Sequence, residues 1–161
     1  MASPNRNADA VVLTIPMRAE YVSIARLTAA GVANRAGFDI ETIEDIKVSL
    51  SEVCNRIINA QYNYDCESDF ECKIEFVISS DSLEIDFYIN RAEELAALIS
   101  GDASFDIGGD MISIDDDGTI DEDRAKEYEE QLQLSLITLL MDEFNINPND
   151  HCLVSMKKYL E

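Results

Sequence analysis

The segment over residues 39–60, DIETIEDIKVSLSEVCNRIINA, constrains the fold of this chain more than any other. Its apolar residues recur at intervals of three and four, which places them along one face of a helix. These residues are Ile43, Ile46, Leu50, Val53 and Ile57. Asp39 is a good N-cap residue, and the acidic residues of the first two turns are favoured by the helix dipole. The segment is therefore predicted to be an amphipathic helix that packs on a core.

The opposite face of this helix is polar. Glu52, Asn55, Arg56 and Asn59 are spaced three, four and seven residues apart, so we expect their side chains to share that face. A carboxylate beside two amides and a guanidinium can bind a ligand or take part in catalysis. The same pattern is also typical of a helix face that is simply solvated.

Patterns on both sides of this helix predict the rest of the fold. Before it, residues 11–17 form a first strand, and residues 20–36 form a helix that ends at Gly37. After it, residues 70–78 and 83–89 alternate apolar with polar positions, as in an antiparallel hairpin with one solvated face. We expect a last helix over residues 123–144 that is buried on most sides from Leu132 onward. A turn at residues 145–150, which contains Pro148, and a strand from Cys152 then complete the chain.

These elements predict an α/β sandwich (α+β), in which a mostly antiparallel sheet has helices on one face. The chain of 161 residues is expected to form a flexible arm, residues 1–9, followed by a single domain, residues 10–161.

Charge and cysteine content limit the function. The net charge of −21 argues against binding to nucleic acid or to an anionic membrane, and it favours a basic protein partner. The four cysteines lack zinc-finger spacing and are read as reduced, mostly buried residues: Cys54, Cys66, Cys72 and Cys152. With no signal-like or membrane-spanning apolar run, the protein is expected to be soluble and cytoplasmic.

Several stretches resemble one family, the anti-sigma-factor serine kinases, which are GHKL ATPases with the Bergerat, or histidine-kinase-like ATPase, fold. The stretches are SLSEVCN, EYVSIARLTAAGVANRAGF, LLMDEF and LVSMKKYL. In that family a glutamate that acts as general base is followed four residues later by an asparagine that binds magnesium. The resemblance places Glu52 at the position of the glutamate, and it implies the family's fold.

The nucleotide motifs of that family are incomplete in this chain. Arg56 stands at the asparagine position, no DxGxG segment follows residues 83–89, and EEQLQL replaces a glycine-rich turn that must approach phosphates closely. We therefore expect a regulatory binding protein without ATP hydrolysis and without a cofactor. The alternative is an active serine/threonine kinase that uses ATP and Mg to phosphorylate an antagonist protein. It would use Glu52 as base and Asn55 or Asn59 as the magnesium ligand, while Arg56 attracts phosphate.

A helix face on residues 20–36 is the candidate partner surface. Val22, Arg26, Ala29 and Ala33 are spaced so that small side chains surround one arginine, which can contact carboxylates of a partner. The resemblance implies that Arg26 contacts a sigma factor or its anti-anti-sigma antagonist in a partner-switching system. It also implies a homodimer formed through the first strand and neighbouring elements.

An acidic region follows residues 83–89. Residues 100–123 are expected to form a loop, which the resemblance identifies with the family's ATP lid. Within it, SIDDDGTIDEDR resembles an incomplete calcium loop, with Ser113 and Arg124 at two of the ligand positions. A third function is therefore a cation-responsive module that uses Asp115, Asp117 and Asp121.

Overall fold

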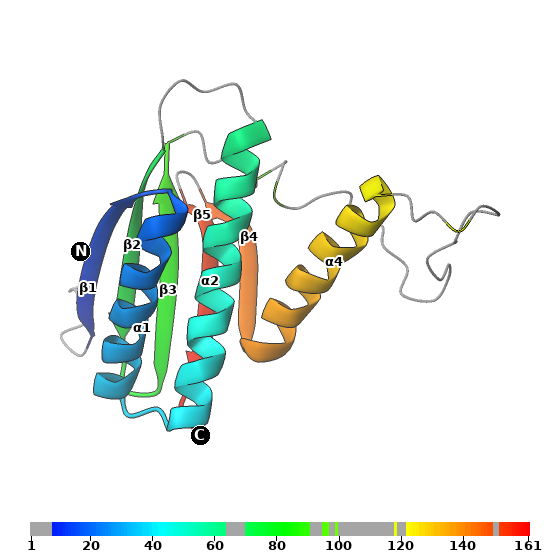
Figure 1. Ribbon diagram of the computed structural model, residues 1–161. Helices are drawn as coiled ribbons and strands as arrows, with labels where there is room; N and C mark the ends of the chain where they lie inside the picture. The colour runs from blue at the N-terminus through cyan, green and yellow to red at the C-terminus, as the bar shows by residue number, and fades with distance from the viewer. Residues whose placement is uncertain are drawn as a thin grey trace.

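The computed structural model describes residues 8–63, 70–90, 95–96, 99, 118, 122–149 and 152–161 of the chain. Its strands form one five-stranded sheet in the order β1-β2-β3-β5-β4, and all four pairings are antiparallel (Figure 1). The strands are β1 (Asp9–Pro16), β2 (Glu71–Ile78), β3 (Ser82–Ile89), β4 (Glu143–Asn149) and β5 (Cys152–Tyr159). The predicted first strand and the predicted hairpin are confirmed.

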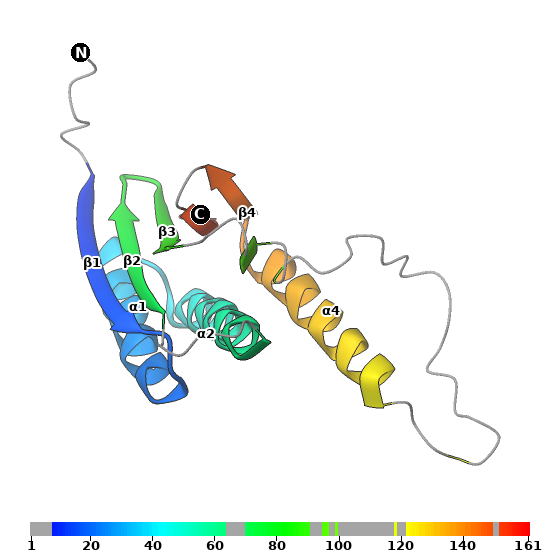
Figure 2. The ribbon, with the colours of Figure 1, turned by 90° about the horizontal axis from the view of Figure 1, so that it is seen from above.

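The helices cover one face of this sheet, as the view from above shows (Figure 2). They are the 3₁₀ turn η1 (Ala19–Tyr21) and the α-helices α1 (Val22–Ala36), α2 (Ile40–Asn63) and α4 (Glu122–Leu140). α2 lies between α1 and α4 in both views. In the described part of the chain, the other face of the sheet carries no helix. The predicted α/β sandwich is confirmed.

The apolar face of α2 forms the centre of the core. Ile46, Leu50 and Ile57 are fully buried, and Val53 is nearly so. At the start of the helix the backbone N–H of Thr42 donates a 2.8 Å hydrogen bond to Oδ1 of Asp39, which is the predicted N-cap. Burial of this stripe against the sheet fixes which residues α2 presents on its opposite side.

The buried side of α1 includes residues that were predicted to face a partner. Ala25, Ala29 and Ala33 are fully buried, whereas Ile24 is 44% exposed. The prediction that Ala29 and Ala33 face a partner beside Arg26 is therefore wrong for these two residues. The small side chains serve the core, because they let α1 approach its neighbours closely. The end of α1 is as predicted: Gly37 adopts a left-handed conformation with φ of 99°.

The last part of the chain contains a strand where a helix end and a turn were expected. α4 ends at Leu140, and Glu143–Asn149 pairs with β5. Pro148 favoured a turn because it cannot donate to a sheet ladder. It is tolerated here because β4 is an edge strand whose register shifts between Ile146 and Asn149.

α4 is also more exposed than its sequence predicts. Ile137 is fully buried, but Leu132, Leu136 and Leu139 are 52%, 40% and 82% exposed. The expectation that the helix is buried on most sides from Leu132 onward is therefore wrong. α4 packs through one side only, which faces the sheet and α2.

Candidate functional site

The polar side of α2 separates its four candidate residues into two environments. Asn55 and Asn59 are exposed, and Glu52 is half-buried. Arg56 is only 7% exposed, although its helical position relative to Glu52 and Asn59 predicted a shared polar face. The expectation that all four residues share one accessible face is therefore wrong for Arg56.

A long-range contact explains the burial of Arg56. Its guanidinium Nη2 donates a hydrogen bond to the backbone carbonyl of Ile99, a residue that follows β3 and is itself 3% exposed. The guanidinium is thus stabilised by a backbone carbonyl of the protein itself. Arg56 holds together two segments that lie 43 positions apart in the sequence.

Glu52 lies one helical turn before Arg56. Its Oε2 atom is buried and has no hydrogen-bond partner in the part of the chain that the structure describes. A buried carboxylate oxygen without a partner is costly, and such an atom is well placed to accept a hydrogen bond from a ligand. Of the four candidates on α2, Glu52 is therefore the one with a buried acceptor that is still open.

The position one helical turn after Glu52 carries no magnesium ligand. A guanidinium has only donors and cannot coordinate a cation, so Arg56 cannot act as the ligand expected one turn after Glu52. Among the described side chains, no group of three or more His, Cys, Asp or Glu is placed to hold a metal ion. Asp115, Asp117 and Asp121, the predicted calcium ligands, lie outside the described residues, as does most of the predicted lid at residues 100–123.

On α1, the exposed residues form a different surface from the predicted one. Arg26 is exposed and Val22 is half-buried. Two apolar residues that the sequence pattern did not select, Ile24 and Leu27, are 44% and 73% exposed. Residues one and two positions apart on a helix point in different directions, so these two side chains do not share one face with Arg26. Because the exposed and buried residues of α1 include similar types, periodicity alone does not identify this side.

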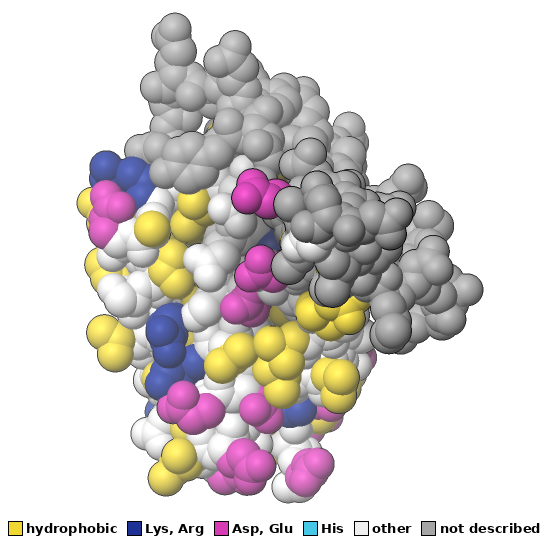
Figure 3. Space-filling model, turned by 45° about the vertical axis from the view of Figure 1, so that its right-hand side comes forward, with side chains coloured by type: hydrophobic (Ala, Val, Ile, Leu, Met, Phe, Trp, Pro, Cys, Tyr) yellow, Lys and Arg dark blue, Asp and Glu magenta, His cyan; other side chains and the backbone are white. Residues whose placement is uncertain are grey.

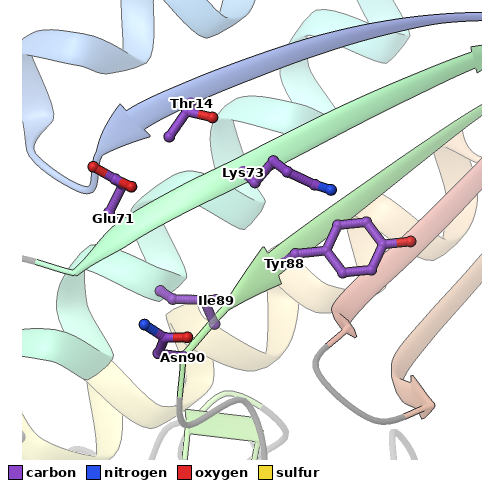
Figure 4. Close-up of a pocket in the computed structure, with 6 residues that line it drawn as sticks. All are labelled: Thr14, Glu71, Lys73, Tyr88, Ile89 and Asn90. Carbon is purple, nitrogen blue, oxygen red and sulfur yellow. The ribbon is translucent and has the colours of Figure 1, made fainter.

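The helix-free side of the sheet holds a shallow hollow of about 400 Å³, which Figure 4 shows in front of the strands. The ammonium of Lys73 lies 4.9 Å from the centroid of the Tyr88 ring and 3.7 Å from a carboxylate oxygen of Glu75. The hollow is lined by Thr14, Glu71, Lys73, Tyr88, Ile89 and Asn90. Glu52 belongs to α2, which covers the other face of the sheet.

Asp86 is the one carboxylate in the described chain that is almost completely buried in the sheet, with 7% of its surface exposed. It lies across from Glu75 on β2 and Ser155 on β5. Burial raises the pKa of Asp86 from 3.8 to about 6, and Glu84 and Glu75 also raise it, while a hydrogen bond with Ser155 lowers it. The sequence pattern placed Asp86 on a solvated face and missed this environment.

The three described cysteines behave as buried apolar residues. Cys54, Cys72 and Cys152 are buried and form no disulfide. Burial raises the pKa of Cys54 to about 12, so its thiol stays protonated and unreactive at neutral pH. In the described ranges, no helix is both long and apolar enough to cross a bilayer.

Comparison with known proteins identifies the fold family. The sequence profile described as "Histidine kinase-like ATPase domain" matches residues 15–158. The chain is 34% identical over 154 residues to the serine-protein kinase RsbW of Bacillus cereus strain G9842, an alignment that covers 95% of this chain and 86% of the relative. It is 36% identical over 155 residues to the protein of that name from Bacillus cereus strain B4264, and 34% identical over 155 residues to that of Bacillus anthracis strain CDC 684, each with the same coverage. The chain therefore belongs to the histidine kinase-like ATPase family, within the branch of the RsbW serine-protein kinases.

Proposed function

We propose that this protein is a regulatory, protein-binding member of the anti-sigma-factor branch that works without ATP hydrolysis. The observation that carries the proposal is the contact of Arg56 with the carbonyl of Ile99. A buried cation occupies the helix position at which the family places its magnesium-binding asparagine, and a magnesium ion next to it would be repelled. A protein that has lost this ligand can still keep the surfaces through which its relatives act.

The partner-binding surface of the proposal lies on α1. Arg26 is exposed and, within the described residues, no contact restrains its guanidinium. The same helix also exposes apolar area at Ile24 and Leu27, which favours association with another protein. Arginine is one of the residue types that dominate the energetics of protein interfaces. We propose a sigma factor, or an antagonist protein that competes with it, as the occupant.

Charge reversal at Arg26 tests the partner surface. Arg26→Glu is expected to weaken capture of a purified sigma factor from the same genome by at least about 100-fold in a calorimetric or surface-binding measurement. Arg35→Glu is the matched control, since Arg35 is exposed on the same helix but lies nine residues away, on roughly the opposite side. Equal affinity of the Arg26→Glu variant and the wild type would remove α1 from the proposal.

Calorimetric titration with ATP and with ADP, each with magnesium, tests the loss of nucleotide chemistry. We expect heats equal to those of dilution for the wild type. Micromolar binding would contradict the proposal, because it would require a site that Arg56 does not block.

A second candidate function is retained kinase activity. The unpartnered Oε2 of Glu52 and the relatives named as serine-protein kinases favour it. Transfer of labelled phosphate from ATP to an antagonist protein, lost in Glu52→Gln, would establish this function. Asn55 and Asn59 would then be the candidate magnesium ligands, because both are exposed on α2.

The proposal also includes a cytoplasmic homodimer. β1 lies at one edge of the sheet, and Val11 and Val12 are 39% and 53% exposed. Sedimentation velocity of the wild type and of a Val12→Lys variant measures this assembly, and a wild-type monomer at micromolar concentration would contradict it.

A further inference from the structure

The exposed side of α4 carries an apolar surface that the proposed function does not use. We call it the α4 stripe, and it consists of Tyr128, Leu132, Leu136 and Leu139. These residues are spaced four, four and three apart, so their side chains fall within roughly a quarter of the helix circumference. Ile137, which is fully buried, lies on the opposite side of the helix. Figure 3 shows hydrophobic side chains gathered on this flank of the molecule.

The end of the helix that bears the α4 stripe is firmly attached to the sheet. Lys158 of β5 donates a 2.8 Å hydrogen bond to the carbonyl of Leu140, and its ammonium lies 3.6 Å from a carboxylate oxygen of Asp142. The backbone N–H of Tyr159 donates a 2.7 Å hydrogen bond to Asp142 Oδ2. Burial of Met141 adds an apolar anchor. The leucines are therefore held in place before any partner arrives, which lowers the entropy lost on binding.

Two hydroxyls next to the leucines are already hydrogen-bonded within the helix. Ser135 donates a 3.0 Å hydrogen bond to the carbonyl of Gln131, and Thr138 donates a 2.9 Å hydrogen bond to the carbonyl of Leu134. These hydroxyls can be covered by a partner without leaving an unpaired donor. The surface around Leu136 and Leu139 can thus be desolvated at low cost.

Charge along α4 indicates what kind of partner fits. Residues 122–130 contain five acidic and two basic residues, whereas residues 131–141 contain no charged residue. An apolar stripe with an acidic end complements a helix that has its own apolar stripe and basic residues beside it. The net charge of −21 over the whole chain adds to this preference.

A second copy of this chain fits the surface poorly. If two α4 helices met in parallel, their acidic halves would lie side by side. If they met antiparallel, each acidic half would approach Glu143 of the other copy, which is exposed just beyond the far end of the helix. Both arrangements place like charges together.

We propose that the α4 stripe is a docking site for a basic amphipathic helix of another protein. α1 and α4 lie on opposite sides of α2, so this site is separate from the surface around Arg26. It requires neither nucleotide nor the partner proposed for α1. The protein would then hold two partners at the same time, one on each flank.

The test uses a labelled synthetic peptide of leucine and lysine whose leucines recur at intervals of three and four. A scrambled peptide of the same composition is the first control. Fluorescence anisotropy at physiological salt is expected to show binding of the patterned peptide to the full chain. The wild type should bind the scrambled peptide at least about tenfold more weakly, and the Leu132→Gln/Leu136→Gln variant should bind the patterned peptide at least about tenfold more weakly. Leu27→Gln, an equally conservative change at a 73% exposed leucine of α1, should leave the affinity unchanged.

Three outcomes would overturn the proposal. The first is that the wild type does not bind the patterned peptide. The second is equal binding of both peptides, or of the variant and the wild type, which would mean that charge alone drives the contact. The third is a wild-type dimer in sedimentation velocity that becomes monomeric in Leu132→Gln/Leu136→Gln, which would identify a second copy as the occupant. Because the changed leucines are 52% and 40% exposed, the variant is expected to keep the fold, which circular dichroism checks.

Discussion

The guanidinium of Arg56 on α2 donates a hydrogen bond to the backbone carbonyl of Ile99, beyond the end of β3. Both residues are buried, so this contact links the central helix to the chain that leaves the hairpin. Because Arg56 is buried, the polar side of α2 has one fewer side chain that a ligand can reach. In exchange, α2 gains a hydrogen bond to a distant segment of the chain.

Replacement of Arg56 by methionine tests how much this hydrogen bond contributes to stability. Arg56→Met keeps the length of the side chain but leaves the buried carbonyl of Ile99 without its donor, so we expect a loss of about 1–3 kcal/mol in the free energy of unfolding. Urea denaturation at pH 7 measures it. Arg26→Met, at an exposed arginine, should change stability by less than about 0.5 kcal/mol. Equal stabilities of the two variants would mean that the contact with Ile99 contributes nothing.

Removal of the charge at Asp86 tests the buried carboxylate. The folded-state pKa of about 6 lies above the ordinary value of 3.8, so the folded state binds a proton more tightly than the unfolded state does. The contribution of protonated Asp86 to the free energy of unfolding is fully present below about pH 4, and it is lost as the pH rises through about 6.

We therefore expect Asp86→Asn to be more stable than the wild type at pH 7, by on the order of 1–2 kcal/mol, and to lose this advantage near pH 4. Urea midpoints measured between pH 4 and pH 7.5 follow the difference. Asp81→Asn, at an exposed position of the same hairpin, should show no such dependence. A constant difference between Asp86→Asn and the wild type across this range would show that Asp86 does not titrate there.

The two glycines of α1 and its cap should respond in opposite directions to the same substitution. Gly31 is inside the helix and Gly37 has φ of 99°, and a Cβ at either position meets no other heavy atom within 4 Å. Backbone conformation alone therefore decides the result. Gly31→Ala should raise stability by about 0.5–1 kcal/mol, and Gly37→Ala should lower it by about 1 kcal/mol. Thermal melts of both variants give the sign of each stability change. Changes of the same sign would show that an effect other than backbone conformation dominates.

Enlargement of Ala29 tests the corrected orientation of α1. Ala29 is fully buried, so Ala29→Leu must push α1 away from its neighbours, and we expect a loss of about 1–3 kcal/mol. Leu27→Ala, on the exposed side of the same helix, should be nearly neutral. If Ala29→Leu left stability unchanged and weakened partner capture instead, the original placement of Ala29 on the partner surface would be correct.

Local patterns in the sequence were sufficient for the main elements. The apolar spacing of Ile46, Leu50 and Ile57 identified the buried side of α2, and Asp39 and Gly37 marked a helix start and a helix end. These signals act over a few residues, so they do not depend on the rest of the fold.

The misplaced residues depend on distant parts of the chain. Arg56 is buried because Ile99 comes to it from the far end of the hairpin, which no helical periodicity encodes. Pro148 lies in a strand because β5 pairs with that segment, and Leu139 is exposed because α4 lies at the flank of the fold. In each case tertiary context overrides a correct local preference.

The two borders of the sheet are unlike. At β4, Asn147 has φ of 52° and Pro148 has no N–H, so the backbone along this border is bent and lacks a donor. At β1, an extended strand of eight residues presents a regular border with exposed valines. A molecule with one blocked and one receptive border cannot add copies in both directions. Any growth by strand addition at β1 is complete once two sheets have joined, so this asymmetry disfavours fibre formation.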